Sequence, residues 1–98
     1  MILEWHKEAV RDLDRLFYFL YEDSPLAAIQ AIDTIEQGSD ILLDHPNSGI
    51  NMQDGTHRQE LFIPFNKGSY ILRYRVDNEK NIIVILRVWH SKEDRPHY

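Results

Sequence analysis

The chain is 98 residues long, contains no cysteine, and carries 16 acidic side chains against 11 lysines and arginines, for a net charge of −5. A single domain of this length buries a small core that packing alone must stabilise, because no disulfide is available. The negative charge weighs against direct nucleic-acid binding, which depends on clustered Lys and Arg displacing counterions from phosphates. No apolar run approaches the ~20 residues of a membrane span and no secretion signal is visible, so a cytoplasmic protein is expected.

Two amphipathic helices are predicted in the first half of the chain, after a short apolar strand at residues 1–5. The first should run from His6 to near Asp23. Ser24 and Pro25 then supply a capping hydroxyl and a proline suited to the first helical turn, so a second helix should begin at once. Two helices joined so closely must run antiparallel. Their predicted buried stripes are Ala9, Leu13, Leu16 and Leu20, then Ala28, Ile32, Ile35 and Leu42.

Gly38 lies inside the second predicted helix, where it marks either a weak point or a close approach of two backbones. Residues 44–56 are predicted to form a loop, because Pro46 pushes the preceding residue out of the helical region. Beyond this loop the hydrophobic period changes from that of a helix to that of a strand. Strands are therefore predicted at residues 57–64, 69–76 and 82–90, with a hairpin turn at 77–81.

Alternation along the last two strands predicts which side chains face the helices. The expected inner set in the first of them is Tyr70, Leu72, Tyr74 and Val76, with Ile71, Arg73 and Arg75 on the reverse. In the second, one face is expected to carry Ile82, Val84, Leu86, Val88 and His90, and the other Ile83, Ile85, Arg87 and Trp89. The order β-α-α-β-β-β describes one α+β domain over residues 1–98, an antiparallel sheet with a helical hairpin on one face.

Several strings carry a resemblance to a known family. They are WHKEAVRDL (5–13), HPNSG (45–49), RQEL (58–61), YILRYRV (70–76) and ILRVWHSKE (85–93). In order and spacing the chain resembles the RelE/ParE superfamily of toxins from bacterial type II toxin–antitoxin pairs, and the ParE branch more closely. The resemblance implies a small toxin that a cognate antitoxin neutralises. Some members of the superfamily cut messenger RNA in the ribosomal A site, whereas ParE-like members inhibit DNA gyrase.

Cutting RNA without a metal requires a proton acceptor, a proton donor and cations around the developing phosphorane charge. If the chain is a nuclease, the candidate catalytic residues are His90, Arg58, Arg73 and Arg87. The last two residues, His97 and Tyr98, invite comparison with a His-Tyr ending found in some nucleases of the superfamily. Glu60 lies among these cations and would repel RNA, so the sequence favours a gyrase inhibitor that has no catalytic residues.

Binding of the target or the antitoxin is expected to involve Arg58, Arg73, Arg75, Arg87, His90 and Lys92. The alternative for the strand arginines is that they are solvated or pair with Glu60, Glu93 or Asp94. For His90 it is a strand-end histidine hydrogen-bonded to the tail, and for the His97-Tyr98 ending it is a frayed terminus, while the order of the tail after Ser91 stays open. No metal or other cofactor is expected, because the histidines lack zinc-site spacing and no glycine-rich phosphate loop is present. A degenerate member that binds an antitoxin without being toxic also stays open.

Overall fold

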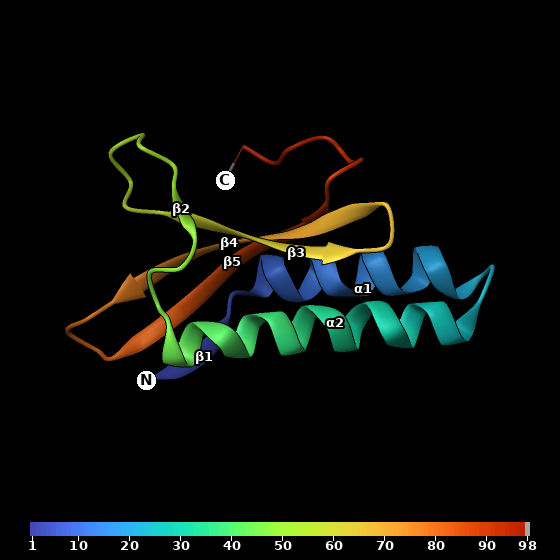
Figure 1. The fold of residues 1–98 in the computed structure, drawn as a ribbon, viewed down its shortest axis with the longest axis horizontal. Helices are drawn as coiled ribbons and strands as arrows, with labels where there is room; N and C mark the ends of the chain where they lie inside the picture. Colours follow the sequence, from blue (N-terminus) through green and yellow to red (C-terminus); the bar gives the residue numbers. More distant parts are fainter. Residues whose placement is uncertain (98) are drawn as a thin grey trace.

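The computed structural model describes residues 1–97, which form a helical hairpin against one face of a sheet (Figure 1). The elements in chain order are β1 (Ile2–Trp5), α1 (Lys7–Tyr21), α2 (Pro25–Asp44), β2 (Ile50–Asn51), β3 (Gln59–Phe65), β4 (Gly68–Asp77) and β5 (Ile82–His90). The five-stranded sheet has the order β1-β5-β4-β3-β2. β1 runs parallel to β5, and the other neighbours are antiparallel. The predicted α+β class is confirmed, but the sheet is mixed and not wholly antiparallel, because β1 joins it parallel to β5. The two-residue strand β2 is an addition to the prediction.

The helical hairpin begins and turns where the sequence predicts. Ser24 caps α2, its hydroxyl oxygen accepting the N–H of Ala27 at 3.2 Å, and Pro25 occupies the first helical position. At the start of α1, Nδ1 of His6 accepts the N–H of Glu8 at 3.1 Å. In the part of the chain that is described, neither helix combines the length and hydropathy that crossing a bilayer requires.

The core lies between the helices and the inner face of the sheet. Tyr70, Leu72 and Tyr74 are buried there, as predicted. The hydroxyl of Tyr74 accepts the N–H of Gly49 at 2.9 Å and donates to Oε1 of Gln59 at 3.2 Å, which ties the loop before β2 to the sheet. Burial raises the pKa of the Tyr74 hydroxyl, although the hydrogen bond from Gly49 opposes this effect.

A bulge changes the faces of β5, so the strict alternation predicted for this strand is wrong. Arg73 lies opposite Arg87, whereas Tyr74 lies opposite Ile85, and Leu86 is left as the extra residue. An inserted residue of this kind reverses the alternation on either side of it. Ile83 and Ile85 therefore belong to the core together with Val88, not to the face of Arg87 and Trp89.

Gly38 marks a close approach of α2 to β3. A methyl group at this position would lie 2.7 Å from Cγ1 and 3.1 Å from Cγ2 of Ile63, distances that real side chains avoid. Because Ile63 is β-branched, it has few alternative rotamers with which to make room. The absence of a side chain at Gly38 thus sets the distance between the hairpin and the sheet.

We expect Gly38→Ala to lower the free energy of unfolding by about 1–2 kcal/mol, because overpacking outweighs the gain of ~1 kcal/mol in helix propensity. Ile63→Ala should remove the conflict, so the double variant should be less destabilised than the sum of the two single variants. Urea denaturation measures this. Gln37→Ala, at the exposed neighbouring position of α2, is the matched control. Additive single effects would contradict the close approach.

Candidate functional site

The outer face of the sheet, away from the helices, is organised by a buried ion pair. Arg73 is 1% exposed, and its Nε and Nη2 donate to Oε2 of Glu60 on β3 at 3.2 and 3.0 Å. Its Nη1 donates to the carbonyl oxygen of Pro96 at 3.0 Å, and its Cζ lies 5.0 Å from the ring centre of Trp89. The Arg73 guanidinium is therefore paired within the chain. Pairing with Glu60 was one of the alternatives that the sequence left open for this arginine.

The C-terminal tail, residues 91–97, crosses this outer face (Figure 1). Arg95 pairs with both carboxylate oxygens of Glu60, and its Cζ lies 5.4 Å from the ring centre of Trp89. These polar contacts anchor the tail to the sheet as far as Pro96, which answers a question that the sequence left open. Tyr98, the second residue of the suggested His-Tyr ending, lies outside the described residues.

A second buried carboxylate, Asp12 of α1, closes the edge of β5. β1 pairs with β5 only along Ile82–Ile85, so the next part of β5 has an open edge. Asp12 is 4% exposed and accepts the N–H of Val88 and the Nε–H of Arg87, each at 2.8 Å. The signal in the sequence is its position: Asp12 comes three residues after Ala9 and four before Leu16, on the buried stripe of the helix.

Arg15 completes this cluster of charges. It donates to Asp12 at 3.3 Å and to the carbonyl oxygen of Val88 at 3.2 Å, and it also pairs with Glu93 of the tail. Burial alone would lower the pKa of Arg15, but Glu93 and Asp12 outweigh this effect and raise the pKa. The sequence predicted neither Asp12 nor Arg15 as a partner of the strand residues.

Three further predicted residues lie apart from these clusters. Arg58 pairs with Asp54 in the loop before β3, at 3.1 Å. The pKa of Asp54 falls to about 2, mainly because the hydroxyl and N–H of Thr56 donate to its carboxylate, with Arg58 contributing. Arg75 on β4 and Lys92 in the tail are exposed. Among the described residues, the side chains of Arg75 and Lys92 form no ion pair.

His90 projects from the opposite face of the sheet. It lies opposite the core residue Tyr70, and the two rings meet edge to face with centres 5.2 Å apart. Its Nδ1 accepts the N–H of Lys92 at 3.1 Å, the hydrogen bond to the tail that the sequence allowed. Arg73 lies on the outer face, so the sheet separates it from His90, whereas the guanidinium of Arg87 is held by Asp12 of α1 at the edge of β5.

His90 lines an apolar groove of about 910 Å³ between α1 and the β3–β4 hairpin. Its apolar lining consists of Leu16, Phe19, Leu20, Phe65 and Tyr70. Phe19 is 77% exposed, more than the other large apolar side chains among the described residues. Lys67 and Lys92 also line the groove, so it combines apolar surface with cations.

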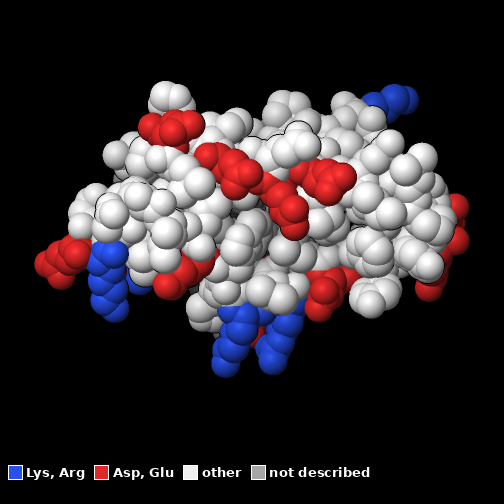
Figure 2. Space-filling view, turned by 90° about the horizontal axis from the view of Figure 1, so that it is seen from below, with Lys and Arg blue, Asp and Glu red and all other residues white. Residues whose placement is uncertain are grey.

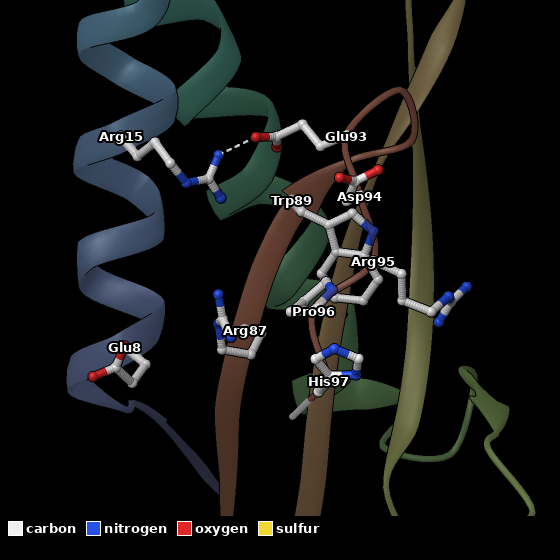
Figure 3. Close-up of a pocket in the computed structure, with 9 residues that line it drawn as sticks. All are labelled: Glu8, Arg15, Arg87, Trp89, Glu93, Asp94, Arg95, Pro96 and His97. Carbon is white, nitrogen blue, oxygen red and sulfur yellow. Dashed lines mark hydrogen bonds and ion pairs between the residues drawn. The ribbon is translucent and has the colours of Figure 1, made fainter.

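A second hollow, of about 670 Å³, lies on the outer flank between α1 and the tail (Figure 3). Arg15, Arg87 and Arg95 line it together with Glu8, Glu93 and Asp94. In Figure 3 the guanidinium of Arg15 points to Glu93, and Arg95 points away from α1. The mixture of charges gives this hollow no excess of cations with which to hold a phosphate.

The fold defines the class of protein. A helical hairpin covering one face of such a sheet is the α+β architecture of the RelE/ParE-like toxins. The chain superposes on a structure titled "Chromosomal ParDE TA system from P. aeruginosa" with a TM-score of 0.69 and 22% identity, over 90% of this chain and 92% of that chain. For the "intact E. coli RelBE toxin-antitoxin complex" the TM-score is 0.58 at 18% identity, over 96% and 98% of the two chains.

Sequence comparison identifies the family. Residues 3–95 match the family described as "ParE toxin of type II toxin-antitoxin system, parDE". Toxin RelE1 of Caulobacter vibrioides is 33% identical over 87 residues, covering 89% of each chain. Toxin RelE3 of the same organism is 34% identical over 93 residues, covering 95% of this chain and 97% of that toxin. The chain belongs to the ParE toxin family of type II toxin–antitoxin systems.

Double-mutant analysis tests whether the outer-face charges are structural. Glu60→Leu leaves the Arg73 guanidinium buried without a counter-charge and should lower the free energy of unfolding by about 3–4 kcal/mol. Arg73→Met should cost less, about 2 kcal/mol, because Glu60 keeps Arg95 as a partner. The double variant should be more stable than Glu60→Leu alone, as measured by urea denaturation. Arg75→Met, at an exposed position of the same strand, is the control. Equal effects in Glu60→Leu and the double variant would contradict the ion-pair argument.

Proposed function

We propose that the chain is a toxin that acts by binding, not by cutting: it inhibits a type II topoisomerase, DNA gyrase, and a cognate antitoxin neutralises it. The observation that supports this best is the separation of the candidate nuclease residues. His90 faces the helix side of the sheet, while Arg73 lies on the other side and the Arg87 guanidinium is held by Asp12 of α1 at the edge of β5. General acid–base chemistry and charge stabilisation must converge on one phosphate, within hydrogen-bonding reach.

The state of the arginines supports the same conclusion. Arg58, Arg73 and Arg87 are each paired with a carboxylate, from Asp54, Glu60 and Asp12 respectively. A guanidinium that a carboxylate already neutralises contributes little to stabilising a second negative charge. Figure 2 shows the helix face, where Asp and Glu side chains spread across the surface and Lys and Arg lie at its margins. This distribution fits a protein target better than a nucleic acid.

The topoisomerase proposal predicts that excess purified protein inhibits supercoiling by gyrase. Arg75 and Lys92 are exposed cations without an ion pair among the described residues, so they are the members of the predicted binding set that are available to a target. Arg75→Ala and Lys92→Ala should each raise the concentration needed for half-inhibition about fivefold, equivalent to ~1 kcal/mol. Lys80→Ala, in the β4–β5 turn, is the charge-matched control and should inhibit like the unmodified protein.

The rival function is ribosome-dependent cleavage of messenger RNA, which the RelE names of the two Caulobacter relatives favour. It predicts new messenger 5′ ends by primer extension after brief expression, lost in His90→Ala and Arg73→Ala. If such ends appear and gyrase is not inhibited, messenger cleavage replaces topoisomerase inhibition as the proposed function. Unrestricted growth on expression without an antitoxin would instead indicate a degenerate toxin, which binds an antitoxin but is not toxic.

A cognate antitoxin is the second partner that we propose, since the solved structures of similar fold are toxin–antitoxin systems. The groove beside α1 suits a segment that folds on binding, because an amphipathic helix can lay its apolar face against such a surface. Lys67 and Lys92, which form no ion pair among residues 1–97, would favour acidic residues on that segment.

We expect Phe19→Ser to weaken antitoxin binding about 30-fold or more, as removal of a central aromatic anchor typically does. Phe19 is 77% exposed, so this change should leave the stability of the free toxin nearly intact. Tyr18→Ser is the matched control: Tyr18 is 65% exposed on the same helix but does not line the groove. Calorimetric titration with the co-purified antitoxin measures both. Equal losses in the two variants would show that the groove is not the binding surface.

A further inference from the structure

The tail lies on the outer face as a bound peptide would. Residues 91–97 have no helix or strand, and the tail leaves β5 through a turn in which the N–H of Glu93 donates to the carbonyl oxygen of His90 at 2.9 Å. Two neighbouring residues then make the contacts: the guanidinium of Arg95 meets the carboxylate of Glu60, and the backbone carbonyl of Pro96 meets Arg73. An arginine and a backbone acceptor side by side are the elements of extended-peptide recognition.

The groups beneath the tail are those of a binding surface. Trp89 is 3% exposed, although it lies on the face that no helix covers. The guanidinium carbons of Arg73 and Arg95 lie 5.0 and 5.4 Å from its ring centre. Without the tail, the face would present an indole ring, carboxylate oxygens of Glu60 and the Nη1 donor of Arg73. An indole and a carboxylate together are a receptor for arginine, whose planar cation stacks on a ring while its N–H groups bind a carboxylate.

The tail is more exposed to solvent than the strands beneath it. Its side chains at 91–95 and 97 are exposed, and only Pro96 is half-buried. Arg15 of α1 pairs with Glu93 of the tail. The hollow shown in Figure 3 otherwise separates the tail from α1. The Arg15–Glu93 pair is exposed on both sides, and the Arg95–Glu60 pair is exposed on the side of the arginine. Solvent weakens such pairs, and the entropy lost on ordering a segment opposes them. The tail can therefore leave the face while the core stays folded.

We propose that the outer face is a peptide-binding site that the tail occupies in cis, and that its partner is an extended protein segment bearing an arginine. The segment places its guanidinium between Glu60 and Trp89, and the following backbone carbonyl accepts from Arg73. The segment binds only when the tail leaves. Its apparent affinity is therefore the intrinsic affinity multiplied by the fraction of time that the tail is undocked. This inference goes beyond the proposed function and does not depend on the identity of the target.

Trp89 reports the position of the tail directly. In the full chain carrying Trp5→Phe, Trp89 is the remaining tryptophan. We expect Arg95→Ala in this background to increase acrylamide quenching of Trp89, because the tail loses its contacts to Glu60 and the indole. Lys92→Ala removes an equal charge from the same tail and should leave quenching unchanged. Circular dichroism confirms that both variants stay folded. Equal quenching in the two variants would overturn the proposal.

The second readout is binding in trans of a synthetic peptide, SKEDRPH, which has the sequence of residues 91–97. The cis tail competes at an effective concentration on the order of millimolar, so the peptide is titrated to that range. If the tail is docked nine-tenths of the time, the Arg95→Ala protein should bind the peptide about tenfold more tightly than the Lys92→Ala protein.

A peptide with alanine in place of its arginine should not bind. Absence of binding to the Arg95→Ala protein, or equal binding of both peptides, would overturn the proposal. Neither readout uses a topoisomerase or an antitoxin, so its failure is distinct from failure of the proposed function.

Discussion

Two buried carboxylates, Asp12 and Glu60, determine where positive charge remains available on this protein. A carboxylate that leaves water must be paired or hydrogen-bonded, because an isolated buried charge is strongly unfavourable. Asp12 therefore gathers Arg87 and Arg15, and Glu60 gathers Arg73 and Arg95. The same contacts hold α1 to the edge of β5 and the tail to the outer face. Structural requirements thus occupy most of the cations that the sheet carries.

The same arrangement limits how a partner can approach the sheet. A strand with an open edge is a template for pairing with another chain. Here the side chains of Asp12 and Arg15 bind the N–H and C=O of Val88, which closes the edge of β5 beyond its contact with β1. On the other side, Pro64 removes a donor from β3. These closed edges favour recognition through surfaces, which agrees with the two that we propose: the apolar groove beside α1 and the outer face under the tail.

Periodicity in the sequence predicts the elements well but not the long-range pairs. The cap at Ser24, both helices and the three long strands follow from local patterns that tertiary packing does not override. The faces of β5 could not be predicted, because the bulge at Leu86 depends on pairing with β4. Glu60, the partner of Arg73, was among the alternatives that the sequence left open, but the partner of Arg87 was missed for a related reason: Asp12 is 75 residues away from Arg87 in the chain. Only the place of Asp12 on an apolar stripe signals that it needs a partner.

The charge arrangement also bears on why one fold serves both nucleases and inhibitors. A nuclease of this shape needs unpaired cations on one face of its sheet, since they must stabilise a phosphorane. Here Glu60 occupies a position directly opposite Arg73, and it converts that cation into part of a neutral pair. In our proposal, a single acidic residue at this register position shifts what the face recognises, from a phosphate to a group with both donors and acceptors. An arginine-bearing peptide offers both N–H donors and carbonyl acceptors. The protein's own tail is such a peptide, since it places Arg95 against Glu60 and the Pro96 carbonyl against Arg73.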